Sequence, residues 1–442
     1  MGLPGKNPDI ADFCPQQSKQ QGVNFMAFSS KMIATATTED WRKPFFLVWT
    51  GQSVSLLGSQ LVQFALIWWL TEKTGSATML AFASFFSYLP EVILAPFAGA
   101  LVDRWNRRKV MMAADGIIAL VTMLLALLFY LEAVQIWHIF VVLFLRSFGK
   151  LFHWAAMKSS TSLMVPEEHL SRIAGINQAV LGGVNIAGPA LGAVLLGIIP
   201  IFGVLFIDVA TALMAIIPLF FVIIPQPQVS DDGKAASVGS VLRDVREGMR
   251  YVLSWRGLCV LLVMAVLCNF FFTPLFSILP ILVTDYFKGG VYQLGWIESA
   301  WGLGVVAGGL ILGAWGGFKR KITSVLAGLI GMGLGMLLVW LAPARLFWLA
   351  LAGMAVAGVS HPITNGPFQA IIQSRVAPEM QGRVFTLVAS LATAAVPLSM
   401  LVAGPAADAF GPRVLYVFGG AGCLVMGVLG FFVPAMQHLE DD

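Results

Sequence analysis

Charged residues are scarce in this chain of 442 residues. Only 11% of them are Asp, Glu, Lys or Arg, whereas 58% are hydrophobic. Soluble globular proteins carry about 25% charged residues, so this chain has too few charges to cover the surface of a water-soluble protein. Uncharged runs such as 258–284 and 324–344 are long enough to cross a bilayer, because about 20 apolar residues span it as a helix. No sustained alternation indicates a β-barrel, so we predict an all-α membrane protein.

Cysteine is also rare, and the common catalytic motifs are missing. The four cysteines are scattered and no two form a Cys-x-x-Cys pair, so we expect no disulfide framework and no metal site. No Gly-x4-Gly-Lys-Ser/Thr loop is present, which argues against ATP as a driving force. Without a His-Glu-x-x-His motif or a Ser/His/Asp set, we expect no enzyme and no cofactor, and the net charge of +4 does not indicate nucleic-acid binding. A membrane-embedded enzyme or sensor is a remote alternative.

Twelve apolar segments are predicted to be transmembrane helices. Most are separated by short turns, and each is about as long as a bilayer crossing. The polar segments 1–44 and 435–442 are predicted to be tails, and the first lacks the charged start and immediate apolar core of a signal peptide. The predicted spans are 45–70, 78–102, 109–131, 137–157, 173–199, 201–224, 257–283, 294–316, 322–341, 346–373, 383–407 and 412–434.

The positive charges predict the orientation of these helices. Twenty-one of the 27 Lys and Arg residues fall in the N-terminal tail and in the loops on its side of the membrane. The opposite loops hold only four, and the remaining two, Arg146 and Lys150, lie within the fourth span. Because Lys and Arg are retained on the cytoplasmic side, we predict a multi-pass protein of the bacterial inner membrane. Both termini are expected to be cytoplasmic, and the protein is expected to be a monomer.

The chain divides into two similar halves. Four short patterns recur in the same order about 210 residues apart, which indicates an internal duplication. We therefore predict two six-helix bundles, 45–224 and 257–434, with a substrate path between them. The segment that joins them, 225–256, contains an amphipathic stretch that is expected to lie along the cytoplasmic face.

The turn after the second span carries a signature. Glycine, acidic and basic residues occur there as Gly-x-Leu-x-Asp-Arg-x-x-Arg-Arg, which resembles the loop 2–3 motif of the major facilitator superfamily, and a Gly-Pro pair resembles the span 5 antiporter motif. Other stretches are similar to the macrolide-efflux branch of its drug:proton antiporters, namely Gly51-Gln52, Gly58-Ser59, 64–68, 247–251, Asn365 and Gln373.

This resemblance implies a fold, an activity and a set of gating residues. It implies two rocking six-helix bundles that export a hydrophobic or amphipathic small molecule in exchange for protons. It also implies that an acidic residue contacts the N-terminal end of span 11, and that a kink in span 5 seals the inner side. A charge cluster that only sets topology, and ordinary helix packing, are the alternatives. The implied gating residues are Asp103, Arg104, Arg107, Arg108, Gly188 and Pro189.

Two ionisable residues are predicted to lie near the bilayer centre. Glu91 lies twelve residues before Asp103, which is roughly 18 Å along a helix. Because an ionisable group costs several kcal/mol there unless it is paired or hydrated, we hypothesise that Glu91 binds the transported proton. Arg146 is predicted at similar depth, and Lys150 and His153 share its helical face. These residues form either a proton-coupling network with Glu91 or a wall that attracts an anionic substrate, and a structural pairing is the alternative.

Further candidates are weaker. His361 and Asn365 are one turn apart in span 10 and either line the cavity or are hydrogen-bonded within the core. Asp115, Asp208 and Glu298 lie near span ends and are expected to be structural. We predict a proton-coupled exporter of macrolide-like or drug-like compounds. A siderophore exporter, a lysophospholipid exporter and an uncoupled facilitator are the alternatives.

Overall fold

Helices make up nearly all the regular structure in the part of the chain that the computed structural model describes, residues 41–102, 105–226, 238–437 and 439–440. Twelve helices are long and apolar enough to cross a membrane. Each overlaps one predicted span, and the predicted fold class is confirmed. In chain order they are α2 (Arg42–Thr74), α3 (Ala77–Val102), α4 (Arg107–Tyr130), α5 (Ile136–Met164), α6 (Glu167–Ile198), α7 (Ile201–Phe221), α9 (Arg256–Ile281, continued by the π-helical turn Leu282–Tyr286), α10 (Val291–Trp315), α11 (Lys321–Leu341), α12 (Phe347–Arg375), α13 (Pro378–Phe410) and α14 (Pro412–Gly430).

Two shorter helices are attached to the second half of the chain. They are α8 (Val238–Ser254) and α15 (Pro434–Gln437). On α8, Val252 is buried in a cluster with residues of α9 and α13, while Glu247 forms an ion pair of 2.9 Å with Arg383 of α13. The apolar face of this amphipathic helix therefore packs against the C-terminal bundle, and its charged face forms an ion pair at the edge of that bundle.

Local chemistry explains where several helices begin and end. Gly75 follows α2 with a left-handed φ of +59°, a conformation that favours glycine. Asn106 caps α4, because its side chain accepts a hydrogen bond of 3.1 Å from the backbone N–H of Lys109. Pro200 precedes α7 and Pro412 is its counterpart at the start of α14, where the missing N–H costs no helical hydrogen bond.

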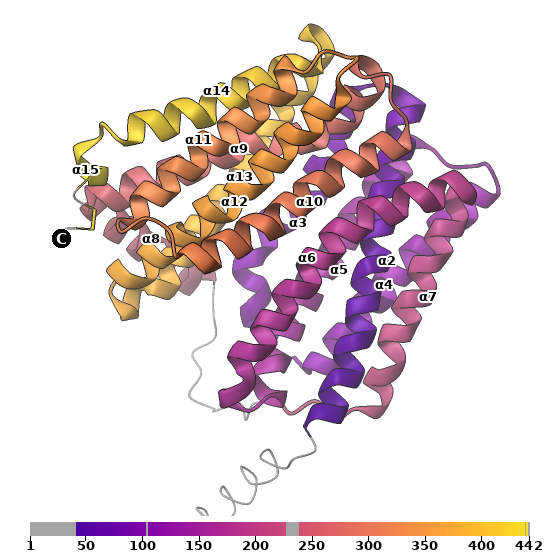
Figure 1. The fold of residues 1–442 in the computed structure, drawn as a ribbon. Coiled ribbons are helices and arrows are strands. Elements are labelled where there is room, and N and C mark those ends of the chain that lie inside the picture. Colours follow the sequence, from indigo (N-terminus) through magenta and orange to yellow (C-terminus); the bar gives the residue numbers. More distant parts are fainter. Residues whose placement is uncertain (1–40, 103–104, 227–237, 438, 441–442) are drawn as a thin grey trace, which may run out of the picture.

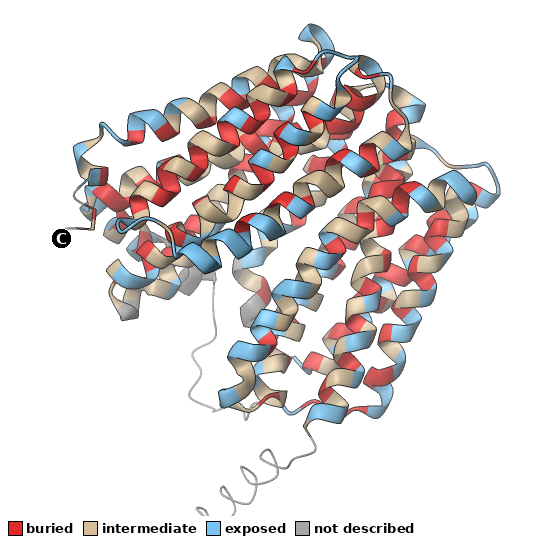
Figure 2. Ribbon diagram, viewed as in Figure 1, coloured by how far each residue is buried: buried red, intermediate tan, exposed pale blue. Residues whose placement is uncertain are grey.

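The outer surface of the helices is apolar. Large side chains such as Phe221, Ile223 and Phe432 are 75–83% exposed, while buried residues gather on the faces that helices turn toward one another (Figure 2). Soluble monomers rarely expose large contiguous apolar areas. This surface is the one expected of a protein whose helices contact lipid.

The twelve long helices form two bundles. Within the first, α2 packs against α6 and α7, while α4 packs against α5 and α7. Within the second, α12 packs against α10 and α11, while α14 packs against α9 and α11. Figure 1 shows the first bundle in indigo to magenta and the second in orange to yellow, each as a separate group of helices.

The bundles meet mainly through two helix pairs, α3 with α13 and α6 with α10, and α9 makes smaller contacts with α2 and α3. The side-chain cluster between α3 and α13 joins Ala81 to Val396 and Met400, so the contact involves the first half of α3 and the second half of α13. This is the end of the molecule with the α2–α3 and α13–α14 turns, which the charge distribution predicts to be outside. In Figure 1 the bundles meet there and diverge toward the opposite end.

Glycines allow the closest helix contacts inside the C-terminal bundle. A Cβ atom added at Gly304 of α10 would clash with the carbonyl oxygen of Ala355 on α12, and one at Gly358 of α12 would clash with the carbonyl oxygen of Trp301. Small residues at facing positions are how membrane helices approach without a hydrophobic driving force. These glycines hold α10 against α12.

We expect Gly304→Leu to destabilise the protein, because the new side chain must separate α10 from α12. Overpacking of this kind costs about 1–3 kcal/mol. The measurement is the apparent melting temperature of the purified protein in detergent. Gly309→Leu is the matched control on the same helix, since a Cβ there meets no atom within 4 Å; equal losses in both variants would contradict the packing argument.

Candidate functional site

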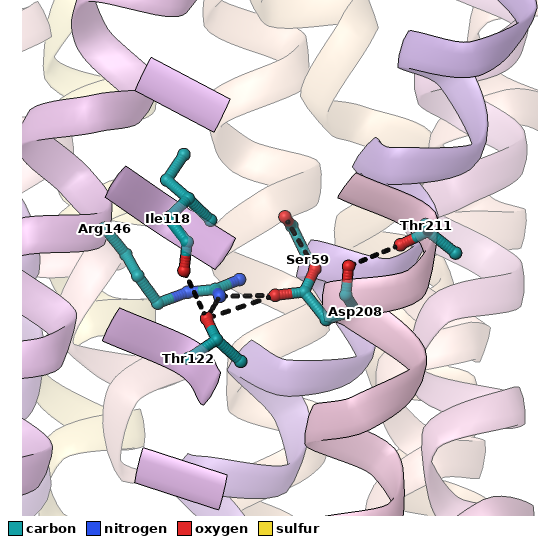
Figure 3. A network of polar contacts seen from close by, with 6 residues as sticks. All are labelled: Ser59, Ile118, Thr122, Arg146, Asp208 and Thr211. Carbon is teal, nitrogen blue, oxygen red and sulfur yellow. Dashed lines mark hydrogen bonds and ion pairs between the residues drawn. The ribbon is translucent and has the colours of Figure 1, made fainter. Parts of the chain in front are cut away.

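A buried ion pair lies inside the N-terminal bundle. Arg146 of α5 approaches Asp208 of α7 with an Nη1–Oδ2 distance of 2.5 Å, and the two side chains are 9% and 0% exposed. Thr122 of α4 accepts a hydrogen bond from Arg146 and donates to Oδ2 of Asp208 at 3.3 Å, while Ser59 of α2 donates to Oδ1 at 3.1 Å. Figure 3 shows these side chains converging from four helices.

The close approach of α2 and α7 makes this network possible. A Cβ at Gly58 would clash with the hydroxyl of Thr211 and lie 3.2 Å from Oδ1 of Asp208. Glycine at this position therefore lets the neighbouring Ser59 reach the carboxylate. The carboxylate receives one guanidinium and two hydroxyl groups, so its charge is compensated although it is removed from water.

A second polar cluster lies in the same bundle. The side-chain amide of Gln52 on α2 donates to Asp115 of α4 at 3.0 Å. The ring Nε2 of His153 on α5 lies 2.8 Å from Oε1 of Gln52 and 3.5 Å from Oδ1 of Asp115. Asp115 is 5% exposed, so the amide and the imidazole replace the water that its carboxyl group has lost.

The two clusters form successive layers. Gln52 and Ser59, Asp115 and Thr122, and Arg146 and His153 are each seven residues apart on one helix. Seven residues are two helical turns, or about 10 Å. The polar residues of α2, α4 and α5 therefore meet at two levels.

Arg146 and His153 face this interior, as their shared helical face predicts, but the partner of Arg146 was not identified from the sequence. Asp208 was expected to be a structural residue near a span end, and it is the fully buried partner of the arginine. Lys150, on the same face of α5 by spacing, is exposed. The sequence shows that charges lie in these spans, but it does not show which of them meet.

Glu91 lies away from these clusters. It is exposed and shares a face of α3 with Ser84 and Tyr88, and Ser84 contacts Ser277 of α9 at 2.7 Å across the bundles. No hydrogen bond or ion pair joins Glu91 to Arg146 among the described residues. Arg146 points into its own bundle, where it pairs with Asp208, whereas Glu91 is exposed. A proton-coupling network that includes both residues stays a prediction.

The predicted gating residues fall into three groups. Asp103 and Arg104 lie outside the described residues. Arg107 donates to the carbonyl oxygen of Ser159 on α5 at 3.2 Å and Arg108 to that of Phe220 on α7 at 2.7 Å, so both bond within the N-terminal bundle.

The third group is the Gly-Pro pair of α6. Gly188 is buried against Gln60 of α2, and the carbonyl group of Pro189 lies beside Gly295 of α10. The pair therefore sits where α6 meets α10 of the other bundle. A proline at this point removes one helical hydrogen bond while its neighbours allow close contact.

His361 and Asn365 of α12 both line a cavity of about 170 Å³ between α9, α11 and α12. The ring of His361 stands edge-on to Trp301 of α10, with 5.4 Å between ring centroids. Among the described residues, no three His, Cys, Asp or Glu side chains gather as a metal site would require.

The sequence does not single out Asp408, near the end of α13. Its Oδ1 accepts from the backbone N–H of Ala77 at 2.7 Å, and its Oδ2 accepts from the N–H of Thr78 at 3.0 Å and the hydroxyl of Ser76 at 2.8 Å. The carboxylate thus caps the N-terminus of α3 from the other bundle, where the helix dipole also favours negative charge. Ser76 and Thr78 beside the turn indicate in the sequence that a helix starts there. Only the fold shows that the capping carboxylate comes from Asp408.

We expect Arg146→Ala to destabilise the protein strongly, because Asp208 would be left as a buried carboxylate without its cation. Removing one partner of a buried pair typically costs about 3–5 kcal/mol. The double variant Arg146→Met with Asp208→Leu should recover much of that loss. Thermal unfolding in detergent measures both, with the exposed Arg345→Ala as control; a double variant no more stable than the single one would contradict this account.

We expect Asp408→Ala to loosen the contact between α3 and α13, because three hydrogen bonds across the bundles are lost. Losing a helix cap costs about 0.5–2 kcal/mol. A cysteine placed at the buried Ser84, in a protein whose native cysteines are replaced by serine, should then react faster with a membrane-impermeant maleimide. Asp285→Asn, an acidic residue at the same predicted end, should leave the rate unchanged. Unaltered labelling in Asp408→Ala would contradict a role in closing this end.

The chain is similar in sequence to proteins that are named as efflux proteins. The chain is 33% identical over 401 residues to macrolide efflux protein A of Streptococcus pyogenes, with 91% of this chain and 98% of that protein covered. It is 25% identical over 415 residues to the multidrug efflux pump Tap of Mycolicibacterium fortuitum, with 91% and 98% covered.

Solved structures share the fold. A bacterial homologue of the human lysosomal transporter Spinster, inward-facing and unoccupied, matches with a TM-score of 0.67 and 13% identity over 91% of this chain and 97% of that one. A bacterial homologue of the iron transporter ferroportin, inward-facing, matches with a TM-score of 0.65 and 15% identity over 91% and 100%. The family model of the Major Facilitator Superfamily matches residues 48–396 and 261–440. The chain therefore belongs to the major facilitator superfamily.

Proposed function

We propose that this protein exports a hydrophobic or amphipathic small molecule, of the macrolide or drug-like class, in exchange for protons. The names of its sequence relatives, macrolide efflux protein A and multidrug efflux pump Tap, support the cargo class. The proposal includes alternating access, in which the two bundles rock about a shared path.

The observation that carries the proposal is the one-sided contact between the bundles. The described contacts join the first half of α3 to the second half of α13, and Asp408 ties the same ends together. Toward the other end, Glu91 on the same face of α3 is exposed. We interpret this arrangement as the state open to the cytoplasm, in which cargo enters between the bundles.

Glu91 is the proposed proton-binding residue. It has no hydrogen-bond or ion-pair partner among the described residues, and it lies on the face of α3 that turns toward the other bundle. Closure of the inner end would remove its carboxylate from water, and an ionisable group in the membrane interior is costly unless it is paired or hydrated. Arg146 would contribute indirectly, by holding α4, α5 and α7 in register through Asp208.

The remaining assignments follow from the same proposal. The bundles 45–224 and 257–434 would move as units in the bacterial inner membrane, joined by the linker 225–256, and the protein would act as a monomer. The tails 1–44 and 435–442 would both be cytoplasmic. The gating residues around Asp103 would close the inner end in the opposite state.

We expect Glu91→Gln to abolish coupling while preserving translocation. In proteoliposomes with an acidic interior, wild-type protein should accumulate radiolabelled erythromycin, a macrolide, above the level that protein-free liposomes reach under the same gradient, and the variant should not. Exchange of labelled for unlabelled drug at equal pH should persist, because the amide keeps the shape of the carboxyl group.

Glu132→Gln, in the exposed turn after α4, is the matched control and should transport like wild type. Normal gradient-driven uptake by Glu91→Gln would contradict the proton assignment. Uptake by wild type that does not depend on the pH gradient would favour an uncoupled facilitator. Transport of a siderophore or a lysophospholipid but not of erythromycin would contradict the proposed cargo class and indicate one of those compounds as the cargo.

A further inference from the structure

A cavity of about 170 Å³ lies within the C-terminal bundle. It is lined by α9, α11 and α12 and is partly open, and most of its wall is apolar. Drug-sized ligands occupy sites of about 300–1,000 Å³, so this cavity accommodates only part of such a molecule. The apolar wall residues include Leu261, Met264, Phe272, Leu329, Met332 and Phe368.

Two asparagines give the cavity a polar side with free acceptors. The side-chain N–H of Asn269 donates to the carbonyl oxygen of Ala265 at 3.0 Å, and that of Asn365 donates to the carbonyl oxygen of His361 at 3.1 Å. Each amide is thus held by its own helix through nitrogen. Within the described residues neither amide oxygen has a protein donor, although a carboxamide oxygen can accept two hydrogen bonds.

Two further polar groups line the same cavity. Thr273 of α9 and the ring of His361 have no hydrogen-bond partner in the part of the chain that the structure describes, and both are lining residues. His361 is held in place by Trp301, whose ring also contacts Phe272 with 5.5 Å between centroids. The ring of His361 is therefore packed in place. Its nitrogens and the hydroxyl group of Thr273 remain able to form hydrogen bonds.

In the N-terminal bundle, by contrast, polar side chains bond to one another. There Gln52, Asp115 and His153 bond to one another across three helices, so their bonding capacity is largely used within the protein. Buried polar groups normally find partners. The groups that remain free in the C-terminal bundle are the ones available to a ligand.

We propose that this cavity binds the polar ring of an amphipathic cargo, a ring that carries hydroxyl or amine groups, while the apolar body of the cargo lies between the bundles. The amide oxygens of Asn269 and Asn365 accept hydrogen bonds from the ring, and the apolar wall covers its faces. This inference rests on the proposed export function and adds which part of the cargo the C-terminal bundle recognises.

The test compares two ligands that differ in their polar rings. Erythromycin carries two sugars, one with an amine, and its aglycone carries none. Equilibrium dialysis of the purified full-length protein should show tighter binding of the glycosylated compound. Asn269→Leu and Asn365→Leu should each weaken that binding about three- to tenfold, the range for losing one hydrogen bond, and should leave aglycone binding unchanged.

Two further variants separate recognition from folding. Asn365→Asp retains an acceptor and should keep most of the affinity for erythromycin. Asn185→Leu is the matched control in α6, where the asparagine pairs with Gln60 at 3.3 Å and lies outside the cavity. It should bind both compounds like wild type, and all variants should elute as monodisperse protein.

The outcomes distinguish this inference from the function it rests on. Wild type that binds both compounds equally, or variants that lose affinity for both alike, would overturn the cavity assignment and leave the export proposal standing. Wild type that neither binds nor transports either compound would overturn the macrolide class, and with it the assignment of the polar ring.

Discussion

The cost of an unpaired charge away from water constrains this molecule more than any other interaction. In lipid or in a dry bundle, an ionised side chain must be paired, hydrogen-bonded or placed where water reaches it. Arg146 and Asp208 satisfy the first condition inside the N-terminal bundle. Asp115 satisfies the second, because it is buried and accepts a hydrogen bond from Gln52.

The antiparallel pair α3 and α13 places helix ends opposite one another at both sides of the membrane. At the predicted outer end, Asp408 in the last turn of α13 caps the start of α3. A carboxylate near a helix N-terminus is favourable because the helix dipole is positive there. This contact holds the end of α13 against the start of α3.

The two bundles share a fold but use their polar residues differently. In the N-terminal bundle, side chains from α2, α4, α5 and α7 bond across helices at two levels, which fixes the packing. In the C-terminal bundle, glycines bring the helices together and the asparagines bond only to their own helices. The N-terminal bundle thus uses its polar side chains to join helices, whereas the asparagines of the C-terminal bundle keep free acceptors.

The sequence by itself determined the twelve helices, their approximate bounds and the twofold division, because bilayer thickness and apolar run length are local properties of the chain. It also indicated the superfamily, through the turn at 99–108, and the presence of unusual charges in the spans. Only the tertiary structure decided that Arg146 pairs with Asp208, 62 residues away. It alone showed that Asp408 of α13 caps the start of α3. These outcomes depend on which helix faces meet, and side-chain contacts between distant segments leave no periodic signal in a single sequence.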